Sequence, residues 1–129
     1  MRTCKDKVVA FVDDDENLTR LMCEFLESRG LEVASFNSAE ALLAADATAY
    51  GVIIMDIQLP GMWGSECVYQ LRNRGYNGPV IAITGYMEQW DEDDLSDLGF
   101  NRIFPKPFEP DEVIECIKEC LDARSRTAE

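Results

Sequence analysis

The chain carries five polar residues at the ends of four short apolar runs, two of them in succession after the first run. They are Asp13, Asp14, Asp56, Thr84 and Lys106. Short apolar runs separated by amphipathic stretches are typical of buried parallel strands, and the carboxyl ends of such strands meet at one edge of a sheet. The sequence therefore predicts that carboxylates, a hydroxyl and an ammonium share one cleft. This set of groups suits a divalent metal ion and a phosphoryl group.

The three aspartates are predicted to form a metal site. Asp13 and Asp14 follow the first apolar run, and Asp56 follows the third, so in a doubly wound sheet they lie on neighbouring strands at the switch point. Carboxylates this close repel one another, and some would take up a proton unless a cation lay between them. Mg²⁺ fits because it takes hard oxygen ligands, and Mn²⁺ accepts the same ligands. Asp15 is instead expected to cap the following helix.

Asp56 is the best candidate for a nucleophile. A carboxylate can attack phosphorus and form an acyl phosphate, and Asp56 precedes a loop containing Pro60, Gly61 and Gly64 that can open to solvent. Thr84 and Lys106 would add a hydrogen-bond donor and a cation beside it. The chain has no histidine, which excludes a Ser-His-Asp triad and removes the commonest zinc ligand.

Composition limits the class of protein. The 129 residues, 47% of them apolar, fit one domain over 1–129, with 125–129 as a polar tail or the start of a linker. The net charge of −13 argues against direct binding of nucleic acid. Five scattered cysteines indicate reduced thiols in the cytoplasm rather than a zinc site or a disulfide framework. No apolar run approaches the roughly 20 residues of a membrane helix, so no membrane insertion is expected.

Strand and helix patterns alternate along the chain. The predicted strands cover 7–13, 32–36, 52–56, 80–84 and 102–104. The predicted helices cover 16–29, 39–47, 65–74, 88–98 and 110–124. This alternation predicts an α/β fold of the doubly wound (βα)5 type, with a five-stranded parallel sheet in the order 2-1-3-4-5 and helices on both faces, as in flavodoxin.

The pattern also predicts helix ends and buried faces. Ser38 is expected to cap the second helix, and Gly30 to end the first. The predicted apolar face of the first helix consists of Leu18, Leu21, Met22, Phe25 and Leu26. That of the last helix consists of Val113, Ile114, Ile117, Cys120 and Leu121.

Four motifs occur in the order typical of one family. They are FVDDDEN at 11–17, IMDIQLPGM at 54–62, AITG at 82–85 and FPKPF at 104–108. With them the chain resembles, over nearly its whole length, the receiver domain of two-component response regulators, and is similar to the single-domain chemotaxis regulators. The resemblance implies that Asp56 is the phospho-acceptor. It also implies that Asp14 binds Mg²⁺ directly, that Asp13 assists, and that Gln58 offers its backbone carbonyl to the metal.

The same resemblance implies roles for the later motifs and for partners. Thr84 and Lys106 would contact the phosphoryl oxygens, and the peptide bond between Lys106 and Pro107 would be cis. The phosphoryl donor would be a phosphohistidine on a sensor histidine kinase or a phosphotransfer protein. The chain would catalyse only its own phosphorylation and slow dephosphorylation, and so would not be a conventional enzyme.

The output surface departs from the usual receiver pattern. Many receivers carry Tyr or Phe three residues before the lysine, where this chain has Ile103. A threonine–aromatic switch is therefore not expected, and Phe104 is predicted to be core. The face formed by the fourth helix, the fifth strand and the fifth helix, with Tyr86, Met87, Trp90 and Ile103, would contact a downstream protein. Tyr86, two residues after Thr84, is hypothesised to shield the acyl phosphate from water.

Three other functions fit parts of the sequence. A haloacid-dehalogenase-like phosphatase would use Asp13 as its nucleophile but would leave Asp56 without a role. A flavodoxin-like flavin binder would need a phosphate loop after the first strand, where three aspartates would repel a phosphate. The chain could also be the receiver portion of a hybrid kinase or of a transcriptional regulator.

Overall fold

A computed structural model of the chain describes residues 8–45, 50–59, 61–85 and 99–127, the last five of these by their backbone alone. The strands are β1 Val8–Val12, β2 Glu32–Phe36, β3 Val52–Asp56, β4 Val80–Thr84 and β5 Arg102–Pro105. The helices are α1 Glu16–Ser28, α2 Ala39–Ala44, α3 Gly64–Asn73 and α5 Pro110–Thr127. The helix predicted over 88–98 lies outside the described residues.

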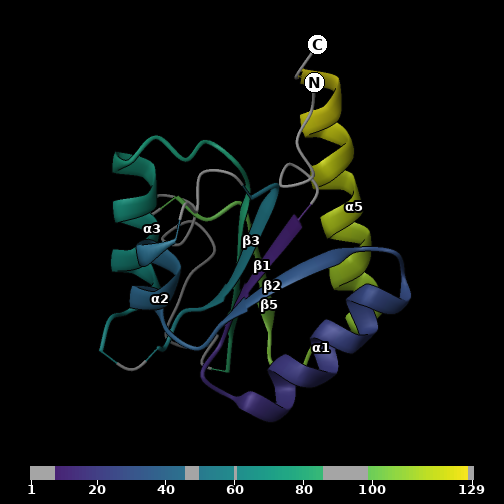
Figure 1. Ribbon diagram of the computed structural model, residues 1–129, viewed down its shortest axis with the longest axis horizontal. Coiled ribbons are helices and arrows are strands. Elements are labelled where there is room, and N and C mark those ends of the chain that lie inside the picture. Colours follow the sequence, from purple (N-terminus) through teal and green to yellow (C-terminus); the bar gives the residue numbers. More distant parts are fainter. Residues whose placement is uncertain (1–7, 46–49, 60, 86–98, 128–129) are drawn as a thin grey trace.

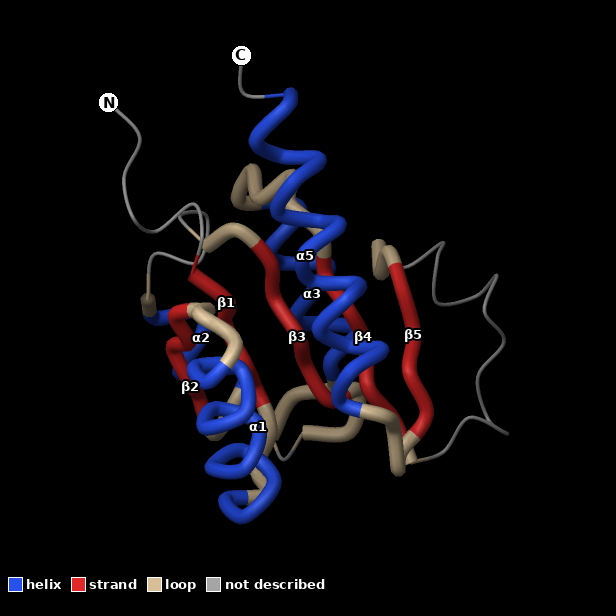
Figure 2. The backbone as a smooth tube through the Cα atoms, turned by 90° about the vertical axis from the view of Figure 1, so that its right-hand side faces the viewer, coloured by secondary structure: helices blue, strands red, loops and turns tan. Residues whose placement is uncertain are grey.

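The five strands form one parallel sheet in the order β2-β1-β3-β4-β5. Helices α1 and α5 cover one face of this sheet, and α2 and α3 cover the other (Figure 1, with the sheet turned toward the viewer in Figure 2). The predicted doubly wound fold and its strand order are confirmed. Because all strands run the same way, their carboxyl ends lie together at one edge.

Alternation along the three central strands divides their side chains between two apolar layers. In β1, Ala10 and Val12 belong to the layer under α2 and α3, whereas Val9 and Phe11 belong to the layer under α1 and α5. All residues of β1, β3 and β4 are buried, as expected for strands covered on both faces. This double burial fixes the register, since a slip of one residue would exchange the two layers.

The helix ends follow the local sequence. Asp15 caps α1 by accepting hydrogen bonds from the amides of Asn17 and Leu18, both at 3.1 Å. Ser38 caps α2 by accepting from Ala41 N at 3.1 Å. Gly30 follows α1 with a φ of +84°, a conformation that glycine adopts at little cost. Both predicted caps and the predicted helix stop are confirmed.

Helix α2 is shorter than predicted, and the other helix boundaries differ only slightly. It ends at Ala44 because Ala45 adopts an extended backbone conformation. Helix α3 begins one residue earlier than predicted, at Gly64. Among the described residues, no helix combines the length and apolar character that crossing a bilayer requires. The described cysteines, Cys23, Cys67, Cys116 and Cys120, are free thiols.

One part of the predicted apolar face of α1 is wrong. Met22 and Leu26 are buried and Leu18 and Phe25 pack against the core, but Leu21 is 59% exposed. The reason is that α1 and the segment after β5 do not close over Leu21. Instead it lines an apolar groove of about 920 Å³ between α1 and residues that include Pro107 and Phe108.

Two leucine-to-alanine variants test this difference in burial along α1. Leu26→Ala is expected to lower the free energy of unfolding by about 2–5 kcal/mol, because Leu26 is fully buried. Leu21→Ala is expected to lower it by no more than about 0.5 kcal/mol, because Leu21 is exposed. Urea denaturation followed by circular dichroism measures both. Equal losses in the two variants would contradict the described packing of α1.

Candidate phosphoryl-transfer site

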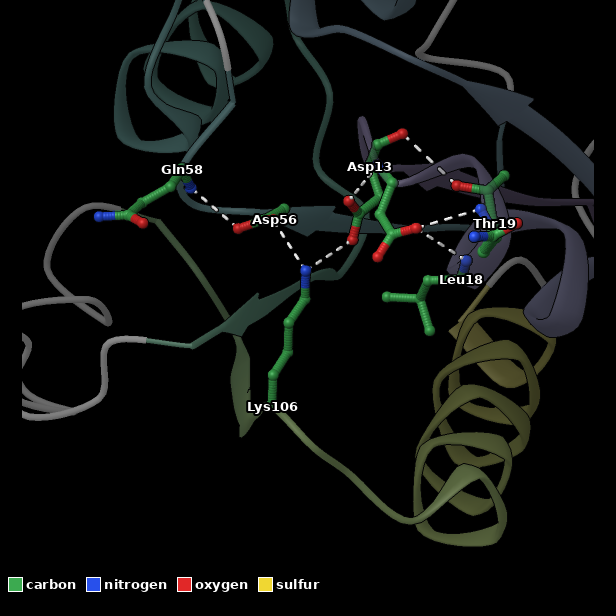
Figure 3. A network of polar contacts seen from close by, with 8 residues as sticks. Asp13, Leu18, Thr19, Asp56, Gln58 and Lys106 are labelled. Carbon is green, nitrogen blue, oxygen red and sulfur yellow. Dashed lines mark hydrogen bonds and ion pairs between the residues drawn. The ribbon is translucent and has the colours of Figure 1, made fainter.

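The carboxyl ends of the central strands bring the predicted site residues together. Asp13 directly follows β1, Asp56 ends β3 and Lys106 directly follows β5. Residues Val12 and Met55 are register partners, which brings Asp13 and Asp56 to the same level of the sheet. Figure 3 shows Lys106 reaching across this edge toward both carboxylates.

Asp13 is a buried carboxylate held at both oxygens. It is only 1% exposed; Oδ1 accepts a hydrogen bond from Asp15 N at 2.9 Å, and Oδ2 accepts one from Lys106 Nζ at 2.9 Å. Burial raises the pKa of Asp13 above its usual range, although the hydrogen bonds from Asp15 and Lys106 act in the opposite direction. Its charged form therefore depends on the neighbouring cation.

Asp56 is held in the same manner. It is 7% exposed; Oδ1 accepts from Gln58 N at 2.9 Å and Oδ2 accepts from Lys106 Nζ at 2.9 Å (Figure 3). Two different donors therefore fix the plane of this carboxylate. One comes from its own loop and the other from a residue fifty positions away in the sequence.

Lys106 supplies the cation that these carboxylates need. Burial lowers the pKa of its ammonium, but the hydrogen bonds and charges of Asp56 and Asp13 outweigh burial and raise that pKa overall. Its backbone N–H donates to Thr84 O at 2.7 Å, which fixes the start of the segment after β5. The peptide bond between Lys106 and Pro107 is cis, as the family resemblance implied.

Asp14 completes a group of carboxylates that fits a metal ion. One oxygen from each of Asp13, Asp14 and Asp56 lies within 4.8 Å of the others, and Asp14 is exposed to solvent. Hard oxygen donors with an open, hydrated side match what Mg²⁺ prefers. The single positive charge of Lys106 leaves this group with a negative balance, which also favours a divalent cation.

The remaining predicted residues differ in burial and position. Thr84 is fully buried at the end of β4, and Gln58 is half-buried beside Asp56. Pro107 is exposed next to the lysine, and Ile103 is half-buried in β5, where it packs against the layer under α2 and α3. Phe104 is buried in the other layer, as predicted. Tyr86, Met87 and Trp90 lie outside the described residues.

Sequence reasoning missed one contributor to the site. Gly64 was expected only to belong to the loop after β3, but its N–H donates to Ile57 O at 2.6 Å. The signal that could have identified it is a glycine at a position where no turn requires a positive φ. The φ of Gly64 is not positive, so its lack of a side chain serves close approach rather than backbone conformation.

Comparison with known proteins assigns the family. The family model described as the response regulator receiver domain matches residues 9–118. The chain belongs to this family. Phosphorylation on an aspartate is the general mechanism of receiver domains, and Mg²⁺ is their general cofactor. This assignment favours the receiver interpretation over the dehalogenase-like phosphatase and the flavin binder.

The chain is similar to bacterial transcriptional regulators. The uncharacterized transcriptional regulatory protein YkoG of Bacillus subtilis is 32% identical over 114 residues, which is 88% of this chain and 50% of that protein. The alkaline phosphatase synthesis regulatory protein PhoP of the same organism is 32% identical over 117 residues, covering 90% of this chain and 49% of PhoP. This receiver therefore spans about half the length of these relatives.

Solved structures show the same fold. A CheY-like receiver domain protein from Methanospirillum hungatei has 27% identity and a TM-score of 0.82, over 94% of this chain and 98% of that one. The response regulator TrrA of Thermotoga maritima, solved in complex with Mg(2+)-BeF, has 29% identity and a TM-score of 0.78, over 88% of this chain and 98% of TrrA.

Removing the cation tests the electrostatics of the site. Lys106→Met is expected to lower the free energy of unfolding by about 1–3 kcal/mol in metal-free buffer at neutral pH, because the buried carboxylates lose their partner. Added MgCl2 should stabilise this variant more than the wild type, since no ammonium competes with the ion. Urea denaturation with EDTA or Mg²⁺ measures both effects.

Lys118 provides the matched control. It is an exposed lysine of α5, and Lys118→Met is expected to change stability by no more than about 0.5 kcal/mol in either buffer. A Lys106→Met protein that is as stable as Lys118→Met without metal would contradict the described ion pairs.

Proposed function

We propose that this receiver accepts a phosphoryl group on Asp56 from a phosphohistidine of a sensor histidine kinase or phosphotransfer protein. The observation that carries the proposal is the contact of Lys106 Nζ with Asp13 and Asp56, at 2.9 Å each, at the carboxyl edge of the sheet. This arrangement places a nucleophilic carboxylate beside a fixed cation. The carboxylate is the group that attacks phosphorus, and the cation offsets the repulsion between that negative carboxylate and a negative phosphoryl group.

We further propose that Asp13, Asp14 and Asp56 hold Mg²⁺, with the backbone carbonyl of Gln58 as an additional ligand. The clustering of the three carboxylates supports this assignment. When bound, the ion would neutralise charge that develops on the phosphoryl oxygens. Mn²⁺ would serve in its place because it prefers the same ligands.

The transfer itself exchanges one bond to phosphorus for another. An oxygen of Asp56 attacks phosphorus and forms the O–P bond of an acyl phosphate, while the N–P bond of the phosphohistidine breaks and its electron pair remains on the imidazole. Water later cleaves the acyl phosphate and restores the carboxylate. Both steps require only the residues of this chain, the ion, the donor and water.

Lys106 would change partners during transfer. Before transfer its ammonium contacts Asp56 Oδ2. Formation of the acyl phosphate removes the negative charge of that carboxylate and adds phosphoryl oxygens with more charge, so the ammonium is drawn to them. The hydroxyl of Thr84 would donate to another phosphoryl oxygen, since Thr84 ends the strand next to β3.

The signal would leave through the face formed by the fourth helix, β5 and α5, where a downstream protein would bind. Ile103 lies on β5 and is half-buried, so this chain would convey the change without an aromatic side chain at that position. The net charge of −13 favours a protein partner over direct contact with nucleic acid. Because the relatives are transcriptional regulators of twice this length, we propose a role in controlling an output domain or a separate target.

Intact mass spectrometry tests the acceptor. The wild type, incubated with MgCl2 and acetyl phosphate, is expected to gain about 80 Da, the mass of one phosphoryl group. Asp56→Asn should gain nothing, and EDTA should prevent the gain in the wild type because the carboxylates would lack their metal ion.

The control is Asp122→Asn, which replaces an exposed carboxylate of α5 and should be phosphorylated like the wild type. A gain of mass that persists in Asp56→Asn but disappears in Asp13→Asn would refute Asp56 as the acceptor.

Tyr86 leads to a separate kinetic prediction. If its ring shields the acyl phosphate from water, Tyr86→Ala should lose phosphate several-fold faster than the wild type. The decay of the phosphorylated mass after removal of acetyl phosphate measures this rate, with Tyr69→Ala, an exposed tyrosine of α3, as control. Equal lifetimes in Tyr86→Ala and the wild type would exclude a shielding role.

A further inference from the structure

The first residue of α3 packs against the backbone that carries Asp56. A Cβ atom added to Gly64 would lie 2.8 Å from Ile57 Cα and 2.9 Å from Asp56 O. These distances are shorter than non-bonded carbon and oxygen atoms tolerate, and the atoms concerned belong to the main chain. At Gly61, by contrast, an added Cβ would meet only the carboxylate of Glu40, at the end of a flexible side chain. Only glycine therefore fits at position 64.

This close approach completes a chain of two hydrogen bonds to the acceptor. Gly64 N donates to Ile57 O at 2.6 Å, and Gln58 N donates to Asp56 Oδ1 at 2.9 Å. The carbonyl of Ile57 and the N–H of Gln58 belong to one planar peptide group and point in opposite directions. The start of α3 thus holds the carbonyl of this rigid peptide, and the N–H on its opposite side holds the carboxylate of Asp56.

The surroundings leave this peptide little freedom. Ile57 is fully buried, and its own N–H donates to Ile83 O of β4 at 3.1 Å. A larger residue at position 64 would therefore rotate the plane of the Ile57–Gln58 peptide, because this buried peptide cannot move out into solvent. Acceptance of the Gly64 hydrogen bond also polarises the peptide and strengthens the Gln58 N–H as a donor.

We propose that Gly64 is a positioning residue for phosphoryl transfer. Its amide orients the Ile57–Gln58 peptide so that Oδ1 of Asp56 is held by Gln58 and Oδ2 is turned toward Lys106. The inference rests on the proposed role of Asp56 as acceptor. Gly64 touches neither the donor nor the reacting atoms and acts through the peptide alone.

Comparison of Gly64→Ala with Val68→Ala tests the proposal. Val68 is a fully buried residue of the same helix, so Val68→Ala loosens α3 but leaves both the main-chain hydrogen bond of Gly64 and the space beside its Cα unchanged. With acetyl phosphate and saturating MgCl2, Gly64→Ala is expected to be phosphorylated about 10- to 100-fold more slowly than the wild type, the cost of misplacing a reacting group by a fraction of an ångström to an ångström. Val68→Ala should keep a rate close to that of the wild type despite a lower unfolding midpoint.

The backbone amide proton of Gln58 gives a second readout, independent of phosphorylation. In nuclear magnetic resonance spectra it should lie downfield in the wild type and in Val68→Ala, and should move upfield in Gly64→Ala as its bond to the carboxylate weakens. A normal rate in Gly64→Ala, an unmoved Gln58 proton, or an equal loss of rate in Val68→Ala would each overturn the proposal. Failure of the wild type to gain phosphate would instead count against Asp56 as acceptor.

If Gly64→Ala does not fold, two measurements on folded protein decide. A scalar coupling across the hydrogen bond between Gly64 N and the Ile57 carbonyl carbon is expected in the wild type, and Asp56→Ala should move the Gln58 proton upfield. Absence of the coupling, or a Gln58 proton whose chemical shift is unchanged in Asp56→Ala, would overturn the proposed positioning role of Gly64.

Discussion

The interaction on which this site depends is the ammonium of Lys106 between two buried carboxylates. Asp13 and Asp56 lie at the ends of neighbouring strands, and burial raises the pKa of Asp13. Lys106 reaches both at 2.9 Å and offsets that cost. The group of three carboxylates and one ammonium still carries a negative balance, which suits a divalent cation.

The parallel sheet makes this interaction possible. Each central strand is buried on both faces, so its register is fixed and its last residue emerges at a defined height. The polar residues after those strands then meet although they are separated by tens of residues in the sequence. The site is thus rigid where its strands end and open where Asp14 faces solvent.

Asp56, the proposed acceptor, is also supported from its own loop. The Ile57–Gln58 peptide receives a hydrogen bond from the start of α3 and passes one to Asp56. Helix α3 therefore touches the candidate site through main-chain atoms, while the segment between β5 and α5 touches it through Lys106. Asp56 is thus held by main-chain atoms on one side and by a side chain from the end of β5 on the other.

The sequence by itself determined the fold and most of the site, because both depend on local patterns. Apolar runs predicted every strand within two residues at either end, and the polar residue after each of four runs identified Asp13, Asp56, Thr84 and Lys106. The helix caps at Asp15 and Ser38 could be predicted equally well, because a capping side chain bonds to an amide within three residues of it.

Only the tertiary structure decided how far burial extends and which backbone atoms approach one another. Leu21 shares the periodicity of its buried neighbours, yet no segment in the described part of the chain closes over it. Gly64 looks like any loop glycine until α3 is packed against Asp56 and Ile57. The exposure of Leu21 and the close approach at Gly64 depend on the distance between elements that are far apart in the sequence. Hydrophobic periodicity shows which face of a helix is apolar but not what packs against that face.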